Sequence, residues 1–315
     1  MNKRDAVLSL LDNDHTSNYI PAAFFLHFDP TYHFGQGAVN KHLEFFQYTG
    51  MDFLKIQYER VFPHIPEIQH PDDWLKMPFY NLNFYEEQLR VVEGLVKGAK
   101  KEALVLLTLY SPFMCAGHST SDQLLTNHFK ENPEKVKHGM QVITESLMLF
   151  VKECIRLGVD GFYHSTQGGE HGRFDDPTLF KEYIRPYDLA LMEEINRVCI
   201  FNILHVCDYR MPFSDLTPFL DYPGHVVNTN LELADTERIS PQDVEQMFAR
   251  PFMGGLDRLG VIAHGSEGEV KNVVQDVLSS APKRFILGAD CTVPSDTSWD
   301  NLRTAISLAH TYRRD

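Results

Sequence analysis

Two cysteines and a histidine have the residue types and the spacing best suited to chemistry in this chain. His205 and Cys207 close the apolar run CIFNILHVC at 199–207, and Cys291 closes a second run, RFILGADC, at 284–291. Such runs predict buried parallel strands, and residues i and i+2 of a strand project from one face. Two thiolates and one imidazole suit Zn²⁺, and three protein ligands leave a fourth position open, as in catalytic zinc sites.

The pair His205 and Cys207 is weak evidence by itself. Buried cysteine is common, and a histidine at a strand end often only satisfies a hydrogen bond. The metal prediction therefore depends on Cys291, a ligand of the right type at the end of another strand. The other cysteines are expected to be small buried hydrophobes: Cys115, Cys154 and Cys199.

The elements that must position these residues alternate along the chain. Strands are predicted at 21–28, 53–58, 103–110, 159–165, 199–207, 225–228, 251–255 and 285–289. Helices are predicted at 41–49, 84–97, 118–130, 133–157, 177–198, 241–249, 267–280 and 300–312. The proline-rich stretch 61–78 predicts a loop. The start of the chain predicts an amphipathic helix, because Asp12 and Asp14 interrupt the apolar stretch that a signal peptide needs.

Eight strands alternating with helices are typical of an α/β protein built as a single (β/α)8 TIM barrel. No internal repeat or linker divides residues 1–315, so one domain is expected. The active site of such a barrel sits at the carboxyl ends of its strands. His205, Cys207 and Cys291 are therefore expected at one mouth.

Composition limits the partners. The net charge of −14 argues against nucleic acid or an anionic membrane as the main partner, and no apolar run approaches the ~20 residues of a membrane span. Five cysteines without a pattern do not suggest a disulfide framework. We expect a cytoplasmic protein.

Motifs spread over most of the chain follow the pattern of a known family. They are IPAAFFLHF at 20–28, STQ at 165–167, YIRPYD at 183–188, MGGLD at 253–257 and CTVPSDT at 291–297. Together they resemble the uroporphyrinogen decarboxylase superfamily, which implies a (β/α)8 barrel. Within it, the His205, Cys207 and Cys291 pattern is similar to the zinc signature of corrinoid:coenzyme M methyltransferases, and cobalamin-independent methionine synthase uses a related set of ligands.

One departure separates the branches of that superfamily. Uroporphyrinogen decarboxylases carry an arginine-rich element just after the first strand, which holds the carboxylates of the substrate. Here the matching place reads HFDPTYH at 27–33, and no arginine lies between Arg4 and Arg60. Arginine forks are the natural partners of carboxylates, so the decarboxylase interpretation ranks second.

The predicted site favours a methyltransferase. A thiol that enters the open position of a zinc ion loses its proton, because the metal stabilises the thiolate far more than the thiol. The resulting nucleophile can take a methyl group. We expect Zn²⁺ as the metal, a small-molecule thiol as acceptor, and a methylated corrinoid as donor, either methylcobalamin or a corrinoid protein.

Further site residues are expected at the same mouth. Glu170 and Asp257 are candidate catalytic groups, of which Glu170 could equally belong to a solvated loop and Asp257 matches the MGGLD motif. Candidate substrate contacts follow the first, fourth and sixth predicted strands: His27, His33, Gln167, His171 and Asn228. Histidines after the first strand could contact an anionic group or serve only as packing aromatics.

Three functions remain open. The leading one is a zinc-dependent methyltransferase acting on a thiol. The second is metal-independent decarboxylation of a tetrapyrrole, in which the cysteine and histidine pattern would be a coincidence. The third is a non-catalytic barrel that binds a corrinoid or a thiol, with zinc as a structural clamp.

Overall fold

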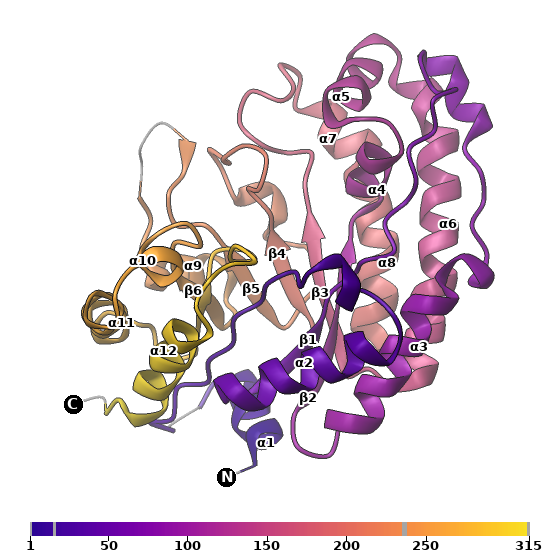
Figure 1. Ribbon diagram of the computed structural model, residues 1–315. Coiled ribbons are helices and arrows are strands. Elements are labelled where there is room, and N and C mark those ends of the chain that lie inside the picture. The colour runs from indigo at the N-terminus through magenta and orange to yellow at the C-terminus, as the bar shows by residue number, and fades with distance from the viewer. Residues whose placement is uncertain (1, 15–16, 235–237, 314–315) are drawn as a thin grey trace.

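Seven parallel strands, neighbours in chain order, form the central curled sheet of the computed structural model, which describes residues 2–14, 17–234 and 238–313 (Figure 1). The side chains on both faces of the sheet are buried, as expected where helices cover a parallel sheet. The strands are β1 (Phe53–Ile56), β2 (Leu104–Tyr110), β3 (Gly161–Thr166), β4 (Ile203–Val206), β5 (Val226–Thr229), β6 (Phe252–Leu256) and β7 (Phe285–Ala289).

The first predicted strand, at 21–28, is not a strand in the structure, so the sheet has seven strands instead of the eight predicted. The segment is extended and lies between β7 and β1, but it makes only one bridge, between Ala22 and Leu287. Side chains take the place of a backbone ladder on its other edge. The Asp52 carboxylate accepts the Ala22 N–H at 2.7 Å, and the Gln57 amide donates to the Leu26 carbonyl at 2.8 Å. The barrel therefore has seven strands and one extended segment.

Helices cover the outside of the sheet, with α3, α6 and α8 on one side and α11 and α12 on the other (Figure 1). The α-helices are α1 (Lys3–Leu8), α2 (Gly35–Thr49), α3 (Leu82–Ala99), α4 (Pro112–Ser119), α5 (Asp122–Glu131), α6 (Pro133–Leu157), α7 (Thr178–Tyr183), α8 (Arg185–Val198), α9 (Pro241–Phe248), α10 (Val261–His264), α11 (Glu267–Ser279) and α12 (Trp299–Thr311). Short 3-10 turns are η1 (Ser9–Leu11), η2 (Pro30–Tyr32), η3 (Pro71–Lys76) and η4 (Thr217–Phe219).

Two predicted helices are each divided in the structure. The helix expected at 118–130 is replaced by α4 and α5, because Ser121 caps α5 by accepting the Leu124 N–H. The helix expected at 177–198 is replaced by α7 and α8, which meet at Ile184 just before Pro186, a residue that supports a helix start and interrupts a helix interior. The long helix α6 has the predicted bounds and ends at Gly158, whose φ of 102° is the left-handed value that glycine adopts most readily.

Helix α1 packs at the amino ends of the strands. Arg4 reaches Asp160, the residue just before β3, with two hydrogen bonds of 2.7 and 2.9 Å. Asp160 in turn accepts the Val105 N–H at the start of β2. This end of the barrel is held together by charged hydrogen bonds, and the opposite, carboxyl end carries the loops that form the candidate site.

Candidate metal centre and its cavity

Strands β4 and β7 bring the three predicted metal ligands together. His205 lies on β4, Cys207 directly follows that strand, and Cys291 lies two residues beyond β7. One potential ligand atom from each side chain lies within 4.8 Å of the other two, and all three residues are buried. The Cys207 N–H donates to the Thr166 carbonyl of β3 at 3.0 Å, which fixes the first turn after β4.

The histidine of this group lacks the hydrogen bonds that a buried ring normally makes. Both ring nitrogens of His205 are buried without a partner among the described residues, while its ring packs against Tyr163 with centroids 4.8 Å apart. Cys207 and Cys291 are free thiols. The hydrogen bond with Cys207, together with the adjacent His205, lowers the pKa of Cys291 well below its usual range. Two cysteine sulfurs beside an imidazole whose ring nitrogens have no partner among the described residues form a donor set that fits Zn²⁺.

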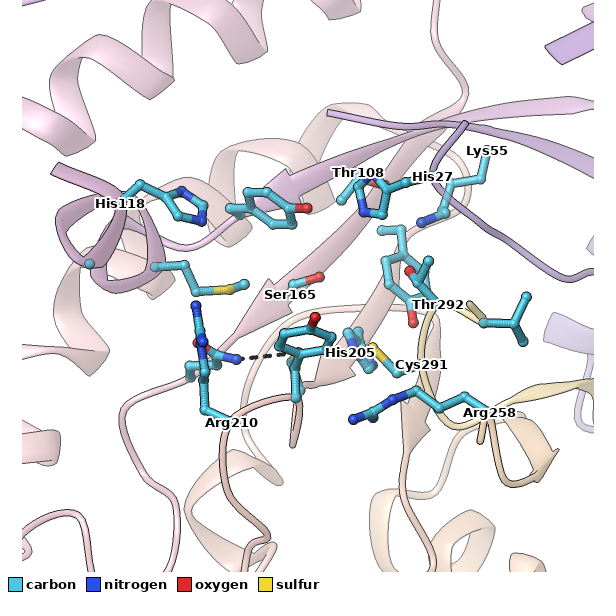
Figure 2. Close-up of a pocket in the computed structure, with 18 of the residues that line it drawn as sticks. His27, Lys55, Thr108, His118, Ser165, His205, Arg210, Arg258, Cys291 and Thr292 are labelled. Atoms are coloured by element: carbon cyan, nitrogen blue, oxygen red, sulfur yellow. Dashed lines mark hydrogen bonds between the residues drawn. The ribbon is translucent and has the colours of Figure 1, made fainter. Parts of the chain in front are cut away.

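A cavity of about 490 Å³ opens beside these residues at the carboxyl ends of the strands (Figure 2). That volume is within the range of small-molecule sites. Its walls combine aromatic rings with three basic side chains. The aromatic residues are Tyr110, Phe113, Tyr163 and Tyr209, and the basic residues are Lys55, Arg210 and Arg258.

Lys55 is a wall residue that sequence analysis missed. It is the charged residue of β1 and is buried, with Nζ donating to Gln57 Oε1 at 2.9 Å. The same ammonium lies 4.5 Å from the ring centroid of Phe25 and 4.6 Å from that of Tyr163. Burial lowers the pKa of Lys55 to about 7, although the nearby Cys291 favours the charged form. A lysine within an otherwise apolar predicted strand was the signal that could have identified it.

Arg258, the second missed residue, links the two ligand-bearing loops. Its guanidinium lies 3.1 Å from Asp208, the residue after Cys207, and its backbone N–H donates to Asp290 Oδ1 at 2.7 Å. Asp290 also accepts the Cys291 N–H at 3.0 Å. Burial raises the pKa of Asp290 to about 7. Arg258 and Asp290 therefore hold the Cys291 backbone next to the loop that carries Cys207.

Two of the predicted substrate contacts line the cavity. Gln167 lies just after β3, and its amide donates to the Cys207 sulfur at 3.5 Å. His27, at the end of the extended first segment, lines the same cavity and holds Glu59 through Nδ1 at 2.9 Å.

The other three predicted contacts are placed outside the cavity lining. His33 contacts the Phe28 carbonyl at 3.0 Å, and His171 is exposed, with its N–H donating to Pro212. Asn228 is fully buried inside the barrel, where it accepts from the Tyr163 hydroxyl at 2.5 Å and donates to the carbonyls of Met253 and Ala289. Its hydrogen-bonding groups are used within the protein.

The two predicted catalytic carboxylates also lie away from the cavity lining. Glu170 is buried in an ion pair with Arg173, whose Nε lies 2.5 Å from Oε2, and Arg173 also reaches Asp122 at 3.0 Å. Asp257 is exposed and caps a turn by accepting the Leu259 N–H at 2.8 Å. These contacts hold loops together, so the structure does not bring either carboxylate to the reacting groups.

The cysteines outside the cluster are buried as predicted. Cys115 and Cys154 are fully buried within helices α4 and α6, and Cys199 lies at the end of α8 with 8% exposure. No helix within the described ranges has both the length and the apolar character needed to cross a bilayer.

The family model for uroporphyrinogen decarboxylase (URO-D) matches residues 46–312, which include β1 to β7 and all three potential metal ligands. The chain belongs to the URO-D family. This confirms the resemblance at the level of the family, and the methyltransferase branch remains a proposal. No curated protein matches this URO-D family member in sequence.

Solved structures share the fold of this URO-D family protein. A methyltransferase from Methanosarcina mazei superposes with a TM-score of 0.78 over 98% of both chains, at 10% identity. A B12-independent methionine synthase from a Shewanella species superposes with a TM-score of 0.52 over 94% of this chain and 95% of that one, at 12% identity. At such identities these likenesses concern the fold.

Proposed function

We propose that this protein is a zinc-dependent methyltransferase that methylates a small thiol, with a methylated corrinoid as the donor. The observation that carries the proposal is His205, buried and unpartnered among the described residues, with two free thiols beside it on a cavity wall. The similarity of fold to a methyltransferase from Methanosarcina mazei supports the reaction class.

His205, Cys207 and Cys291 would hold the metal. A bound Zn²⁺ supplies one kind of chemistry here, the ionisation of a coordinated thiol at neutral pH. Two protein thiolates and a neutral imidazole balance the charge of the ion, so the acceptor sulfur stays electron-rich.

The surrounding residues prepare that site. The Gln167 amide donates to the Cys207 sulfur and orients it. Asp290 and Arg258 fix the backbone that presents Cys291. Aromatic walls, with Tyr163 packed on the His205 ring, exclude water from the face where the acceptor sulfur would meet the methyl group.

The cavity is less suited to a tetrapyrrole that carries many carboxylates. Its lysine and arginine side chains are Lys55, Arg210 and Arg258, and Arg258 already pairs with Asp208. A structural zinc clamp is also a poorer fit, because the three side chains line a cavity instead of packed core.

Elemental analysis of protein purified without chelators tests the metal site. Wild type and the control Cys199→Ser should carry about one zinc per chain, and Cys207→Ser and Cys291→Ser should carry much less. Cys199 is a matched control because it is also a buried cysteine, outside the cavity lining. Equal zinc in all four proteins would overturn the site.

Thiol binding tests the reaction. Cobalt-substituted protein should gain a sulfur-to-metal charge-transfer band when a thiol is added, and the zinc protein with the same thiol should demethylate methylcobalamin. A cobalt spectrum that no thiol perturbs would mean a closed site, and the methyltransferase proposal would fall.

A further inference from the structure

His27 and Glu59 form an imidazole–carboxylate pair at the cavity wall. His27 Nδ1 lies 2.9 Å from Glu59 Oε1, and the Glu59 side chain is 9% exposed while that of His27 is 40% exposed. Burial acts to raise the pKa of Glu59, but the hydrogen bond from His27 and the other nearby imidazoles outweigh it and lower that pKa. Glu59 is therefore ionised and can only accept hydrogen bonds.

The ionised carboxylate fixes the tautomer of the ring. Because Glu59 only accepts, the hydrogen must sit on Nδ1 of His27, and the neutral ring presents the lone pair of Nε2. Nε2 makes no hydrogen bond to any residue that the structure describes, and His27 lines the same cavity as Cys207 and Cys291. In Figure 2, His27 and Lys55 lie on one side of the cavity, with His205 and Cys291 towards the other.

Other titratable groups surround this pair. His33 Nδ1 lies 3.6 Å from the second oxygen of Glu59. His42 on α2 is fully buried, and burial lowers its pKa to about 4, so it is neutral. Lys55 lies on the same side of the cavity as the pair and already donates to Gln57. Among these groups, Glu59 supplies the negative charge that would stabilise a protonated His27.

We infer that Nε2 of His27 accepts the proton of the acceptor thiol, and that Glu59 positions the ring and stabilises the imidazolium. This inference deepens the proposed function and rests on it. The S–H bond breaks and its electron pair stays on sulfur, while an N–H bond forms at Nε2. The sulfur then takes the methyl group, and the corrinoid keeps the electron pair of the broken cobalt–carbon bond. The half-exposed ring passes the proton to solvent.

Lys55 is the rival acceptor on the same wall. Its Nζ lies over the rings of Phe25 and Tyr163 and donates to Gln57, and the side chain is buried from solvent. His27 has both an unpartnered nitrogen and an exposed edge through which a proton can leave. The geometry favours His27 for this reason.

The rate of thiol binding tests the inference without measuring turnover. Cobalt-substituted protein is mixed with 2-mercaptoethanol at pH 7, where an ordinary thiol is mostly protonated, and the sulfur-to-metal charge-transfer band is followed in time. In wild type and the control His33→Gln the band should rise quickly, because His27 takes the thiol proton and passes it to solvent. In His27→Gln the band should rise roughly 10²-fold more slowly, and Glu59→Gln should also be slowed, while the final amplitude stays the same.

Each other outcome has a defined meaning. Equal binding rates for wild type and His27→Gln at pH 7 overturn the inference and leave the proposed function intact. A cobalt spectrum that the thiol perturbs in no protein overturns the proposed function itself. Slow binding by Lys55→Met, with His27→Gln still fast, assigns the proton transfer to Lys55 and overturns the inference.

A pH profile provides a second, independent readout. At pH 7 the kcat/KM of His27→Gln with methylcobalamin should fall roughly 10²-fold, a loss typical of general-base removal, and should recover as the pH approaches the thiol pKa. A loss of equal size at every pH would indicate a purely structural role for His27 and would contradict the inference.

Discussion

Two buried histidines on neighbouring strands differ in their surroundings. His205 on β4 and His164 on β3 both have two buried ring nitrogens without partners among the described residues. His205 faces the barrel interior beside two thiols. Tyr163 and Ser165 line the cavity, so strand alternation turns His164 outward, towards the helices. Missing hydrogen bonds alone therefore do not identify a metal ligand, and converging donor atoms are needed as well.

The outer region around His164 is adapted to neutral groups. Burial lowers the pKa of His164 to about 3. Asp188 on α8 is fully buried there, accepting from the hydroxyls of Thr166 and Tyr222, and burial raises its pKa to about 7. His164 is therefore neutral above about pH 3 and Asp188 is neutral below about pH 7, so both side chains are uncharged between these values.

The largest expected difference between the two histidines is in zinc-dependent stability. Zinc at roughly 1,000 times its Kd should raise the unfolding free energy of wild type by about 4 kcal/mol. His164→Leu should keep this gain, and His205→Ala should lose it because it removes a ligand. Denaturant unfolding with and without zinc measures both. If zinc stabilised both variants equally, His205 would not differ from His164 in metal binding.

Asn228 sharpens the comparison, because it is a buried polar residue whose groups are all used. Asn228→Ala leaves the Tyr163 hydroxyl and the carbonyls of Met253 and Ala289 without their partner. The unfolding free energy should fall by about 1–3 kcal/mol, with zinc content unchanged. Loss of zinc with an unchanged unfolding free energy would instead show that Asn228 contributes to the metal site.

The pH dependence of stability separates the two neutral groups of the outer region. His164 has a lowered pKa, so the unfolded chain binds its proton first, and this residue makes stability rise with pH between about 3 and 6.5. Asp188 has a raised pKa and makes stability fall between about pH 4 and 7. Each slope approaches about 1.4 kcal/mol per pH unit.

Single variants reveal each slope because the two oppose one another in wild type. Relative to wild type, the stability of Asp188→Asn should rise more steeply with pH, and that of His164→Leu should fall more steeply. Urea unfolding at several pH values gives the slopes. Parallel curves for all three proteins would show that neither group is held neutral.

The smallest effect is expected for His164→Leu at pH 7. Replacing an unpartnered polar ring by an apolar side chain removes a desolvation penalty and leaves no other group without a partner. The unfolding free energy should change by no more than about 1 kcal/mol. A large loss of stability or of zinc would show that His164 has an interaction that makes it more like His205.

The sequence was sufficient to place the sulfur and imidazole groups. His205, Cys207 and Cys291 end apolar runs, and parallel strands bring such ends together at one mouth. The segment at 21–28 was predicted as a strand because its residues are apolar, but Asp52 and Gln57 supply hydrogen bonds that a strand partner would make. Side-chain substitutes of this kind leave no periodic trace in a sequence.

Charged residues were harder to interpret because their roles depend on distant partners. Glu170 was a plausible catalytic group until the structure placed it against Arg173 and Asp122. Lys55 was overlooked because its position in a predicted strand does not show which face it occupies, and only the folded barrel shows that it faces the cavity. Burial and pairing decide whether a charge is structural or reactive, and both arise from tertiary contacts.

The extended segment between β7 and β1 has a mechanical consequence. The seven strands pair continuously from β1 to β7, and the ring closes through segment 21–28, which makes one β-bridge to β7 and a few further backbone hydrogen bonds, such as that from the Asp52 N–H to the Ala22 carbonyl. This closure has fewer backbone hydrogen bonds than the strand pairs have. The amides of Ala22 to Phe28 should lose protection from hydrogen exchange before those of β2 and β3. His27 belongs to this segment, so we expect the cavity wall that carries it to open before the others.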